Sequence, residues 1–183
     1  LSYREAEASL NNFHNLMVKS PEKQPLHPKE LKNIQQLSFE QVVFKHRTAS
    51  HKAIDGISFN AETGETIAFV GPSGSGKSTL MKLLVGLYRP QEGRILYNGL
   101  DETEINFDDL RKQIGFVTQD TNLFSGTIRE NLVFVNPTAT DNELMEVLEK
   151  ASCMNLIRRA EKGLETLIGE GGLKLSGGEK QRL

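Results

Sequence analysis

The sequence predicts an α/β fold, and three consecutive features support that prediction. Thr66–Val70 is a short, almost wholly apolar run, which is typical of a strand buried on both faces of a sheet. The glycine-rich stretch GPSGSGKST, residues 71–79, follows it directly. From Ser78 to Leu87, leucines recur at helical spacing. A buried strand, a glycine loop and a helix in this order indicate one strand–loop–helix unit of an α/β domain.

The composition is that of one soluble domain. The 183 residues are 37% hydrophobic and 25% charged, an ordinary balance, and no apolar run approaches the roughly 18 residues of a spanning helix. The net charge of −2 argues against the basic surface that nucleic-acid-binding proteins use. Cys153 is the only cysteine, which excludes an internal disulfide and a thiolate zinc cluster. We therefore expect no nucleic-acid partner and no direct insertion of this segment into a bilayer.

The N-terminal part differs from the rest of the chain. Residues 1–20 place apolar side chains at three- and four-residue steps, which predicts an amphipathic helix. Residues 21–36 contain three prolines and mixed charges with little periodicity, which predicts a linker. A helix with nothing of its own to pack against is usually a piece of something larger or a partner-binding element. The globular domain is expected to span residues 37–183.

Shorter patterns predict the remaining elements of the domain. The expected strands are residues 37–39, 42–44, 57–59, 94–97 and 114–117. Asn98-Gly99 directly after the strand at 94–97 predicts a hairpin turn. Residues 140–162 are expected to be helical, with Thr140 or Asp141 as cap. Within this stretch the spacing favours core packing over a redox role for Cys153, and a solvated face for the charges of 158–162.

The glycine-rich stretch has the residues that a phosphate site needs. It matches G-x-x-x-x-G-K-[ST], in which the glycines let several backbone N–H groups point inward and the following helix adds partial positive charge. The Lys77 ammonium can then reach the β- and γ-phosphates, and the Ser78 hydroxyl can ligate Mg²⁺. The flanking strand and helix favour this site over a plain glycine turn with a surface lysine. The residues expected to contact the nucleotide are Gly71, Ser73, Gly74, Ser75, Gly76, Lys77, Ser78 and Thr79.

Two further motifs resemble those of the ATP-binding cassette (ABC) ATPases. The segment 175–179, LSGGE, followed by KQRL, resembles the signature motif of that family, and residues 117–120, VTQD, look like its Q-loop. The resemblance covers the chain from about residue 37 to its end. It implies a P-loop NTPase fold with a RecA-like core and an antiparallel β subdomain before the phosphate loop. It further implies a helical subdomain over about 126–176.

The resemblance also implies roles for the motif residues. Lys77 and Gln119 would be the catalytic residues within this chain, with Gln119 completing the Mg²⁺ shell beside Ser78 and sensing the γ-phosphate. The signature would contact ATP held by the opposite subunit of a head-to-tail dimer. The signature residues expected there are Ser176, Gly177, Gly178 and Glu179. The alternative for Gln119 is a solvated glutamine in a turn. The alternative for Ser176 is a plain helix cap.

The adenine position departs from the family pattern. Members usually stack the base on a tyrosine before the phosphate-loop strand. Alignment on Phe39, Val42 and Phe44 puts His46 at that position. A histidine stacks less strongly than a tyrosine, so contact with the base and a plain surface position both stay open for His46.

The segment 122–131 is similar to the one that follows the Q-loop in ABC exporters. This resemblance implies ATP binding and hydrolysis coupled to substrate efflux. The expected partners are a second nucleotide-binding domain and a transmembrane domain fused upstream, at the cytoplasmic face of the cell membrane. One departure is Leu167, where exporters often carry a glutamate. A soluble ABC ATPase that remodels macromolecules is the alternative, whereas a P-loop kinase leaves LSGGE and the Q-loop without a role.

The family's catalytic glutamate and switch histidine follow the signature, and neither occurs in the 183 residues. We therefore expect the central sheet to lack strands and the chain alone to bind Mg-ATP weakly or not at all, without turnover. The motifs fit a homodimer and a heterodimer of nucleotide-binding domains alike.

Overall fold

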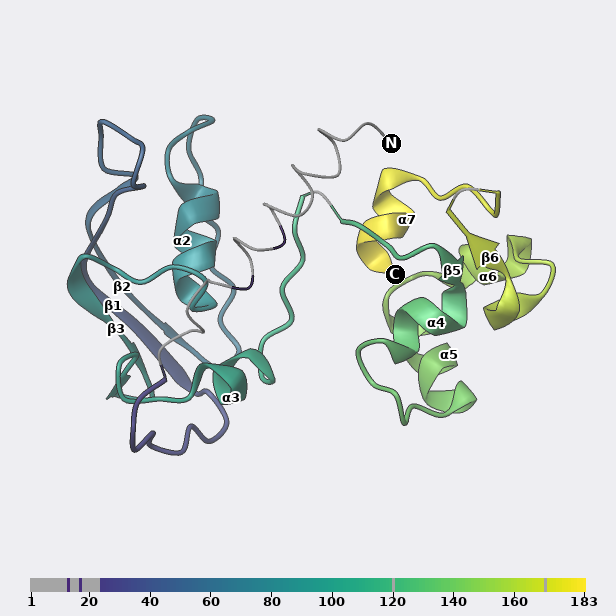
Figure 1. Cartoon of the computed structure of the whole chain (residues 1–183), viewed down its shortest axis with the longest axis horizontal. Coiled ribbons are helices and arrows are strands. Elements are labelled where there is room, and N and C mark those ends of the chain that lie inside the picture. The colour runs from purple at the N-terminus through teal and green to yellow at the C-terminus, as the bar shows by residue number, and fades with distance from the viewer. Residues whose placement is uncertain (1–12, 14–16, 18–23, 120, 170) are drawn as a thin grey trace. The chain divides into compact units, whose positions relative to one another are not determined.

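The computed structural model describes residues 13, 17, 24–119, 121–169 and 171–183. They belong to two compact units, Leu1–Gly115 and Phe116–Leu183, which are described here separately (Figure 1). The helix predicted over residues 1–20 lies outside the described residues except at Phe13 and Met17. Both of these residues are helical and exposed.

The first unit is built on a four-stranded antiparallel sheet in the order β2-β1-β3-β4 (Figure 1). The strands are β1 (Gln36–Phe44), β2 (Ile54–Glu62), β3 (Glu92–Tyr97) and β4 (Leu100–Asp101). The two short strands predicted over 37–44 form one strand, β1, whose pairing with both neighbours shifts register around Gln41 (φ 47°). The predicted hairpin is confirmed, because Asn98 (φ 51°) and Gly99 (φ 76°) take the left-handed conformation of a two-residue turn.

Two helices complete this unit, α2 (Lys77–Leu84) and α3 (Phe107–Arg111). Leu80 and Leu83 of α2 are buried in one cluster with apolar side chains of the sheet and of α3. The helix ends before the predicted Leu87, because Gly86 turns left-handed (φ 68°) where a Cβ would come within 2.3 Å of the Phe107 ring. The sheet and helix α2 thus hold the phosphate loop at the N-terminal end of a packed helix.

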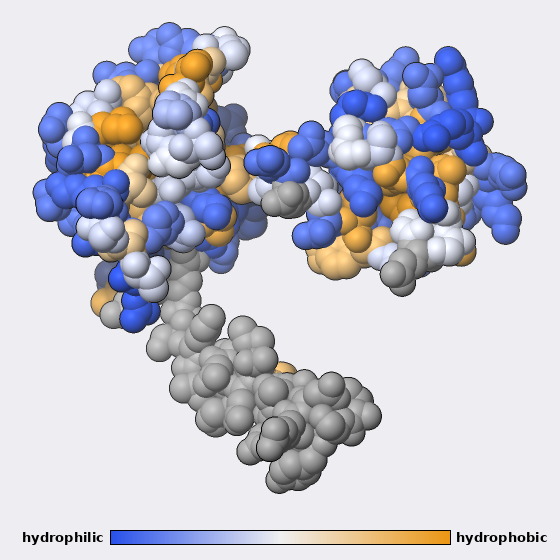
Figure 2. Space-filling view, turned by 90° about the horizontal axis from the view of Figure 1, so that it is seen from above, coloured by the Kyte–Doolittle hydropathy of each residue, from blue (hydrophilic) through white to orange (hydrophobic). Residues whose placement is uncertain are grey.

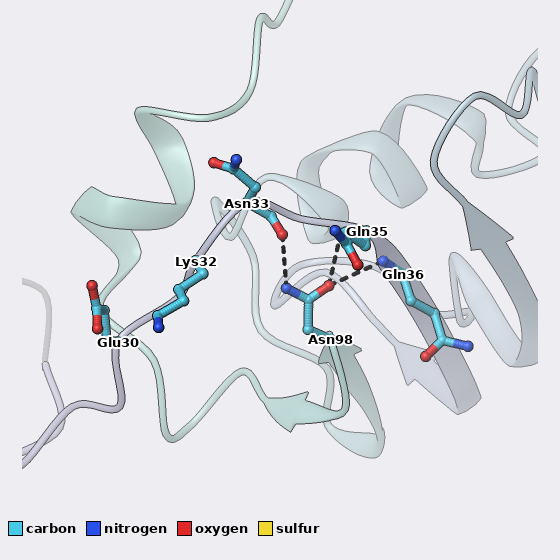
Figure 3. Close-up of a pocket in the computed structure, with 6 residues that line it drawn as sticks. All are labelled: Glu30, Lys32, Asn33, Gln35, Gln36 and Asn98. Carbon is cyan, nitrogen blue, oxygen red and sulfur yellow. Dashed lines mark hydrogen bonds between the residues drawn. The ribbon is translucent and has the colours of Figure 1, made fainter.

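The described part of the predicted linker packs against the first unit. Leu31 is only 5% exposed and belongs to the core. Lys29 pairs with Glu104 at 2.6 Å. The Asn98 amide accepts hydrogen bonds from the backbone N–H groups of Gln35 and Gln36 and donates to the carbonyl of Asn33, as Figure 3 shows. Residues 24–35 form no helix or strand, and they are held along the first unit.

Two predicted strands are absent. Residues 65–70 and 114–118 belong to no strand, and Val70 and Val117 are 94% and 70% exposed. Strands need hydrogen-bonding neighbours, and no described strand of the antiparallel sheet pairs with either run. Both runs are apolar, but an apolar composition alone does not provide a neighbouring strand with which to form hydrogen bonds.

Glu102 is a buried carboxylate in the first unit, 3% exposed, and its Oε2 has no hydrogen-bond partner in the described structure. Burial raises the pKa of Glu102 to about 7, against the opposing charge of Arg89. The folded protein therefore keeps a proton that the unfolded chain loses above about pH 4.5. Stability is expected to fall between these two values, by up to about 3 kcal/mol.

Glu102→Gln is accordingly expected to remove this fall and to raise stability above pH 7, because the amide needs no ionisation. Urea unfolding at pH 5 and pH 8 measures the difference between the variant and the wild type. Glu65→Gln, a change of an exposed carboxylate in the same unit, is the control. An equal loss of stability from pH 5 to pH 8 in wild type and Glu102→Gln would contradict the assignment.

The second unit is mainly helical. It also contains a short antiparallel pair of strands, β5 and β6. Its elements are β5 (Gly126–Thr127), α4 (Ile128–Val133), α5 (Asp141–Lys150), α6 (Met154–Arg159), η1 (Gly163–Glu165), β6 (Leu167–Ile168) and α7 (Gly177–Arg182). The helix predicted over 140–162 is two helices, because Ser152 turns left-handed (φ 56°) between α5 and α6. Thr140 is the cap, in a capping box with Glu143. Cys153 is 1% exposed in the core of this unit, as predicted.

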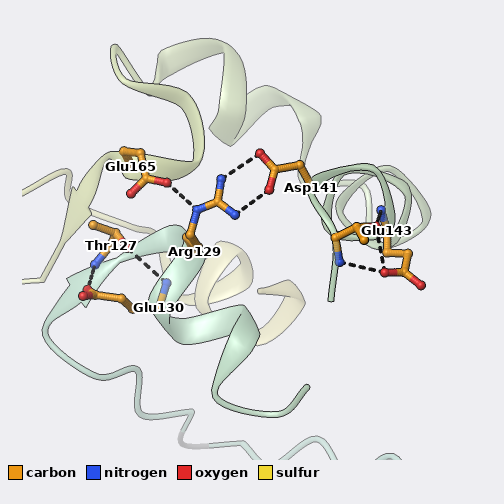
Figure 4. A network of polar contacts seen from close by, with 7 residues as sticks. Thr127, Arg129, Glu130, Asp141, Glu143 and Glu165 are labelled. Carbon is orange, nitrogen blue, oxygen red and sulfur yellow. Dashed lines mark hydrogen bonds and ion pairs between the residues drawn. The ribbon is translucent and has the colours of Figure 1, made fainter. Parts of the chain in front are cut away.

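Arg129 of α4 joins three elements of the second unit, as Figure 4 shows. Its guanidinium donates two hydrogen bonds to the carboxylate of Asp141, at 2.6 and 2.8 Å, and a third to Glu165. The hydrogen bond from Arg129 lowers the pKa of Asp141. The contribution of this pair is therefore present near neutral pH and is lost as the pH falls through the lowered pKa of Asp141.

Arg129→Ala is expected to lower the Tm of this unit, and the loss should shrink in acid because Asp141 is then protonated in both proteins. Thermal unfolding followed by circular dichroism at pH 7 and at pH 3 measures both effects. Arg158→Ala, at an exposed arginine of α6, is the matched control. A Tm that is unchanged at pH 7 would show that the network adds nothing to stability.

Candidate nucleotide-binding site

The phosphate loop runs from Gly71 to Gly76 and leads into α2 at Lys77. Gly74 and Gly76 have φ of 81° and 92°, a region that glycine occupies at little cost. A Cβ on Gly76 would lie 2.3 Å from the Ala53 carbonyl oxygen, so only glycine fits between the loop and the start of β2. The sequence motif thus corresponds to a specific backbone shape.

The Lys77 ammonium lies within the loop. Its Nζ donates to the carbonyl oxygens of Gly71 and Pro72, at 2.8 and 2.7 Å, and approaches Ser75 Oγ at 3.4 Å. These are neutral acceptors, and phosphate oxygens are stronger ones because they are charged. The loop therefore places its cation where an anion can displace the carbonyl contacts.

The first turn of α2 supplies backbone donors. Gly76 is its N-cap, and no side chain accepts a hydrogen bond from the first-turn N–H groups. Ser78 and Thr79 lie in this turn. Uncommitted N–H groups and partial positive charge at a helix start favour a bound phosphate. The predicted phosphate-contacting residues of 71–79 are therefore brought together.

His46 lies beside the phosphate loop. Its Nε2 is 3.2 Å from Thr79 Oγ1, and its ring makes edge contacts with Phe44 and Tyr88, at centroid distances of 5.0 and 5.4 Å. Phe44 and Tyr88 stack on each other. An aromatic side chain next to the loop suits contact with a nucleotide base. The role of His46 in binding the base remains a prediction.

Gln119 and the signature residues belong to the second unit. The backbone carbonyl of Gln119 accepts a hydrogen bond from Gln181 Nε2 at 3.2 Å. Ser176 is the N-cap of α7 in a capping box with Glu179, so the cap that was the alternative for Ser176 is present. Gly177 is exposed, and its backbone is open to a ligand.

Glu179 has more partners than the sequence suggested. Its carboxylate accepts hydrogen bonds from the backbone N–H and the hydroxyl of Ser176, both at 2.8 Å. It also forms an ion pair with Arg159 of α6. The hydrogen bonds from Ser176 and then the charge of Arg159 lower the pKa of Glu179. The side chains of Gln181 and Arg159 were not singled out in the sequence. The spacing of Ser176 and Glu179, a capping-box pattern, was a usable signal for the cap alone.

Comparisons with known proteins agree with these motifs. The family model described as ABC transporter matches residues 54–183. The mitochondrial iron-sulfur clusters transporter ATM1 of Kluyveromyces lactis is 42% identical over 99% of this chain and 26% of its own length. The protein of the same name from Saccharomyces cerevisiae is 48% identical over 80% of this chain and 21% of its own length.

A solved structure of a bacterial Atm1-family ABC exporter with ATP bound is 36% identical and superposes with a TM-score of 0.83. The superposition covers 98% of this chain and 32% of the exporter chain. The chain thus spans about a fifth to a third of the length of these proteins. In its described part, no helix is both long enough and apolar enough to cross a membrane. The chain belongs to the ABC transporter family and has the fold of its ATP-binding domain.

Proposed function

We propose that the chain is the nucleotide-binding domain of an ABC exporter, in which ATP binding and hydrolysis drive substrate efflux. The phosphate loop carries this proposal, because Lys77 lies inside a glycine-shaped loop where its ammonium contacts only neutral oxygens in the described structure. The relatives are transporters and exporters by name, which favours efflux over the soluble remodelling ATPase.

The residues present fit a magnesium-bound nucleotide. The loop amides and Lys77 would hold the β- and γ-phosphates, and His46 would contact the adenine. Ser78 and Gln119 would supply oxygen ligands, which Mg²⁺ prefers. Bound Mg²⁺ would neutralise phosphate charge. The residues of this chain would hold the phosphates in a fixed position.

The signature would complete the site of a second nucleotide-binding domain. Ser176, Gly177 and Gly178 would contact the γ-phosphate held by that domain, in a head-to-tail dimer. Support comes from the exposure of these residues at the start of α7. Glu179 would hold Ser176 in position, because its carboxylate accepts hydrogen bonds from the Ser176 N–H and hydroxyl.

An exposed apolar surface on the second unit supports docking to a transmembrane domain. Phe124 and Phe134 are 59% and 68% exposed and lie 4.6 Å apart between ring centroids, next to Val135. Hydrophobic side chains are visible on the surface of this unit in Figure 2. Exposed apolar clusters of this kind mark interaction sites. We propose that a transmembrane domain fused upstream covers this surface at the cytoplasmic face of the membrane.

Binding of a fluorescent ATP analogue to the protein that carries this chain tests the proposal. Binding is expected to require Mg²⁺, to be displaced by ATP and to be far less sensitive to AMP, which lacks the β- and γ-phosphates. ATP-dependent movement of cargo into inverted vesicles separates an exporter from the soluble alternative. Iron-sulfur clusters, the cargo given in the names of the yeast relatives, are the first to assay. Failure of ATP to displace the analogue would contradict the proposed site.

A further inference from the structure

The side chain of Gln181 connects the signature helix to the backbone of the Q-loop. Its Nε2 donates to the carbonyl oxygen of Gln119 at 3.2 Å and approaches that of Thr118 at 3.4 Å. Gln181 belongs to α7, whereas Thr118 and Gln119 precede it by about sixty residues in sequence and lie in the same unit. This is a tertiary contact between two motifs.

The rest of the signature segment is held firmly to the same unit. Both oxygens of Glu179 are engaged, one by the N–H and hydroxyl of Ser176 and the other by Arg159 of α6. Gln181 lies two residues beyond Glu179 on α7. Ser176 and Gln119 are therefore connected by the hydrogen bonds of Glu179 and Gln181 and by the backbone of α7 that carries both side chains.

We propose that Gln181 is a positioning residue that makes Gln119 and Ser176 move together. This inference rests on the proposed function, in which Gln119 senses the γ-phosphate of its own chain's ATP and Ser176 contacts the ATP of the opposite subunit. By holding the Gln119 carbonyl, Gln181 fixes the backbone from which the Gln119 side chain extends. A nucleotide at one site then biases the geometry at the other, which is a coupling between sites.

The proposal depends on a donor at position 181. A glutamine amide has an N–H₂ group that can donate to two carbonyls, whereas a glutamate of the same shape only accepts and is repelled by them. A lysine is also a donor. Gln181→Glu therefore removes the contact, while Gln181→Lys retains a group able to make it.

The test measures ATP binding and steady-state ATPase activity of the full protein for wild type, Gln181→Glu and Gln181→Lys. Gln181→Glu is expected to lower kcat about two- to tenfold, the effect of one hydrogen bond, and to move the Hill coefficient for ATP toward 1. Affinity for the fluorescent ATP analogue is expected to stay within about twofold, because the described hydrogen bonds of Gln181 go to the backbone carbonyls of Thr118 and Gln119. Gln181→Lys should resemble wild type. Gln36→Glu makes the same chemical change at an exposed glutamine of β1 and is the matched control.

The outcomes separate this inference from the proposed function. If wild type binds ATP and hydrolyses it with a Hill coefficient of 1, or if Gln181→Glu leaves kcat and cooperativity unchanged, the coupling role is wrong while the ATP site stands. Equal losses in Gln181→Glu and Gln181→Lys also overturn the donor role. If wild type does not bind ATP at all, the proposed function itself fails.

Discussion

Lys77→Ala is expected to weaken ATP binding about 10- to 100-fold and to reduce ATP hydrolysis below detection. The ammonium is the only charge that lies inside the described phosphate loop, where it contacts the Gly71 and Pro72 carbonyls. Each charge-assisted hydrogen bond to a phosphate contributes on the order of 1.5–3 kcal/mol, which corresponds to the expected loss. Equilibrium binding of the fluorescent ATP analogue and a phosphate-release assay measure the two effects.

Lys82→Ala is the matched control, since it removes a lysine from the same helix. Lys82 lies over the Tyr88 ring, 5.5 Å from its centroid. Affinity for ATP within about twofold of wild type is expected for this variant, because the contact does not involve the loop. Equal binding by wild type and Lys77→Ala would show that the loop is a structural turn and not a phosphate site.

Gly76→Ala is expected to destabilise the first unit and to abolish ATP binding. The residue has φ of 92°, and a Cβ would come within 2.3 Å of the Ala53 carbonyl oxygen and 2.9 Å of Ile54 Cδ1. The strained conformation alone costs about 1–2 kcal/mol, and displacing the backbone carbonyl adds to it. Urea unfolding and analogue binding measure the losses.

Gly74→Ala separates strain from steric conflict. Gly74 also has positive φ (81°), but nothing lies within 4 Å of its Cβ position. Gly74→Ala is therefore expected to lower the free energy of unfolding only by the cost of placing alanine at positive φ, about 1 kcal/mol. If both variants lose the same stability, the close approach of Gly76 to Ala53 has no energetic consequence.

The antiparallel part of the fold could be predicted because its determinants are local. Asn98-Gly99 identifies the hairpin, and the apolar clusters at 37–39 and 42–44 identify the two halves of β1. The strands expected at 66–70 and 114–117 were not found, because their partners are not given by local sequence. The break between α5 and α6 was missed for a similar reason. Serine does not by itself signal the end of a helix, yet Ser152 has a left-handed conformation in the folded unit.

The candidate site was predictable where a motif fixes backbone shape. Gly74 and Gly76 have positive φ, and the lysine that follows them places its ammonium inside the loop. The contacts of Gln181 and Arg159 were not predictable, because they join side chains whose spacing in sequence carries no pattern. The docking of Leu31 and its neighbours onto the first unit was also missed, since three prolines without periodicity read as a linker.

The central claim is that the phosphate loop of one chain works with the signature of another. Mixing Lys77→Ala with Ser176→Arg subunits tests it most directly, because each variant alone is expected to be inactive. In a head-to-tail dimer, the intact loop of the Ser176→Arg subunit meets the intact signature of the Lys77→Ala subunit. The account predicts that the mixture regains ATPase activity that neither variant has by itself. If the mixture stays as inactive as the separate variants while dimers form, the signature does not act on the ATP of the opposite subunit.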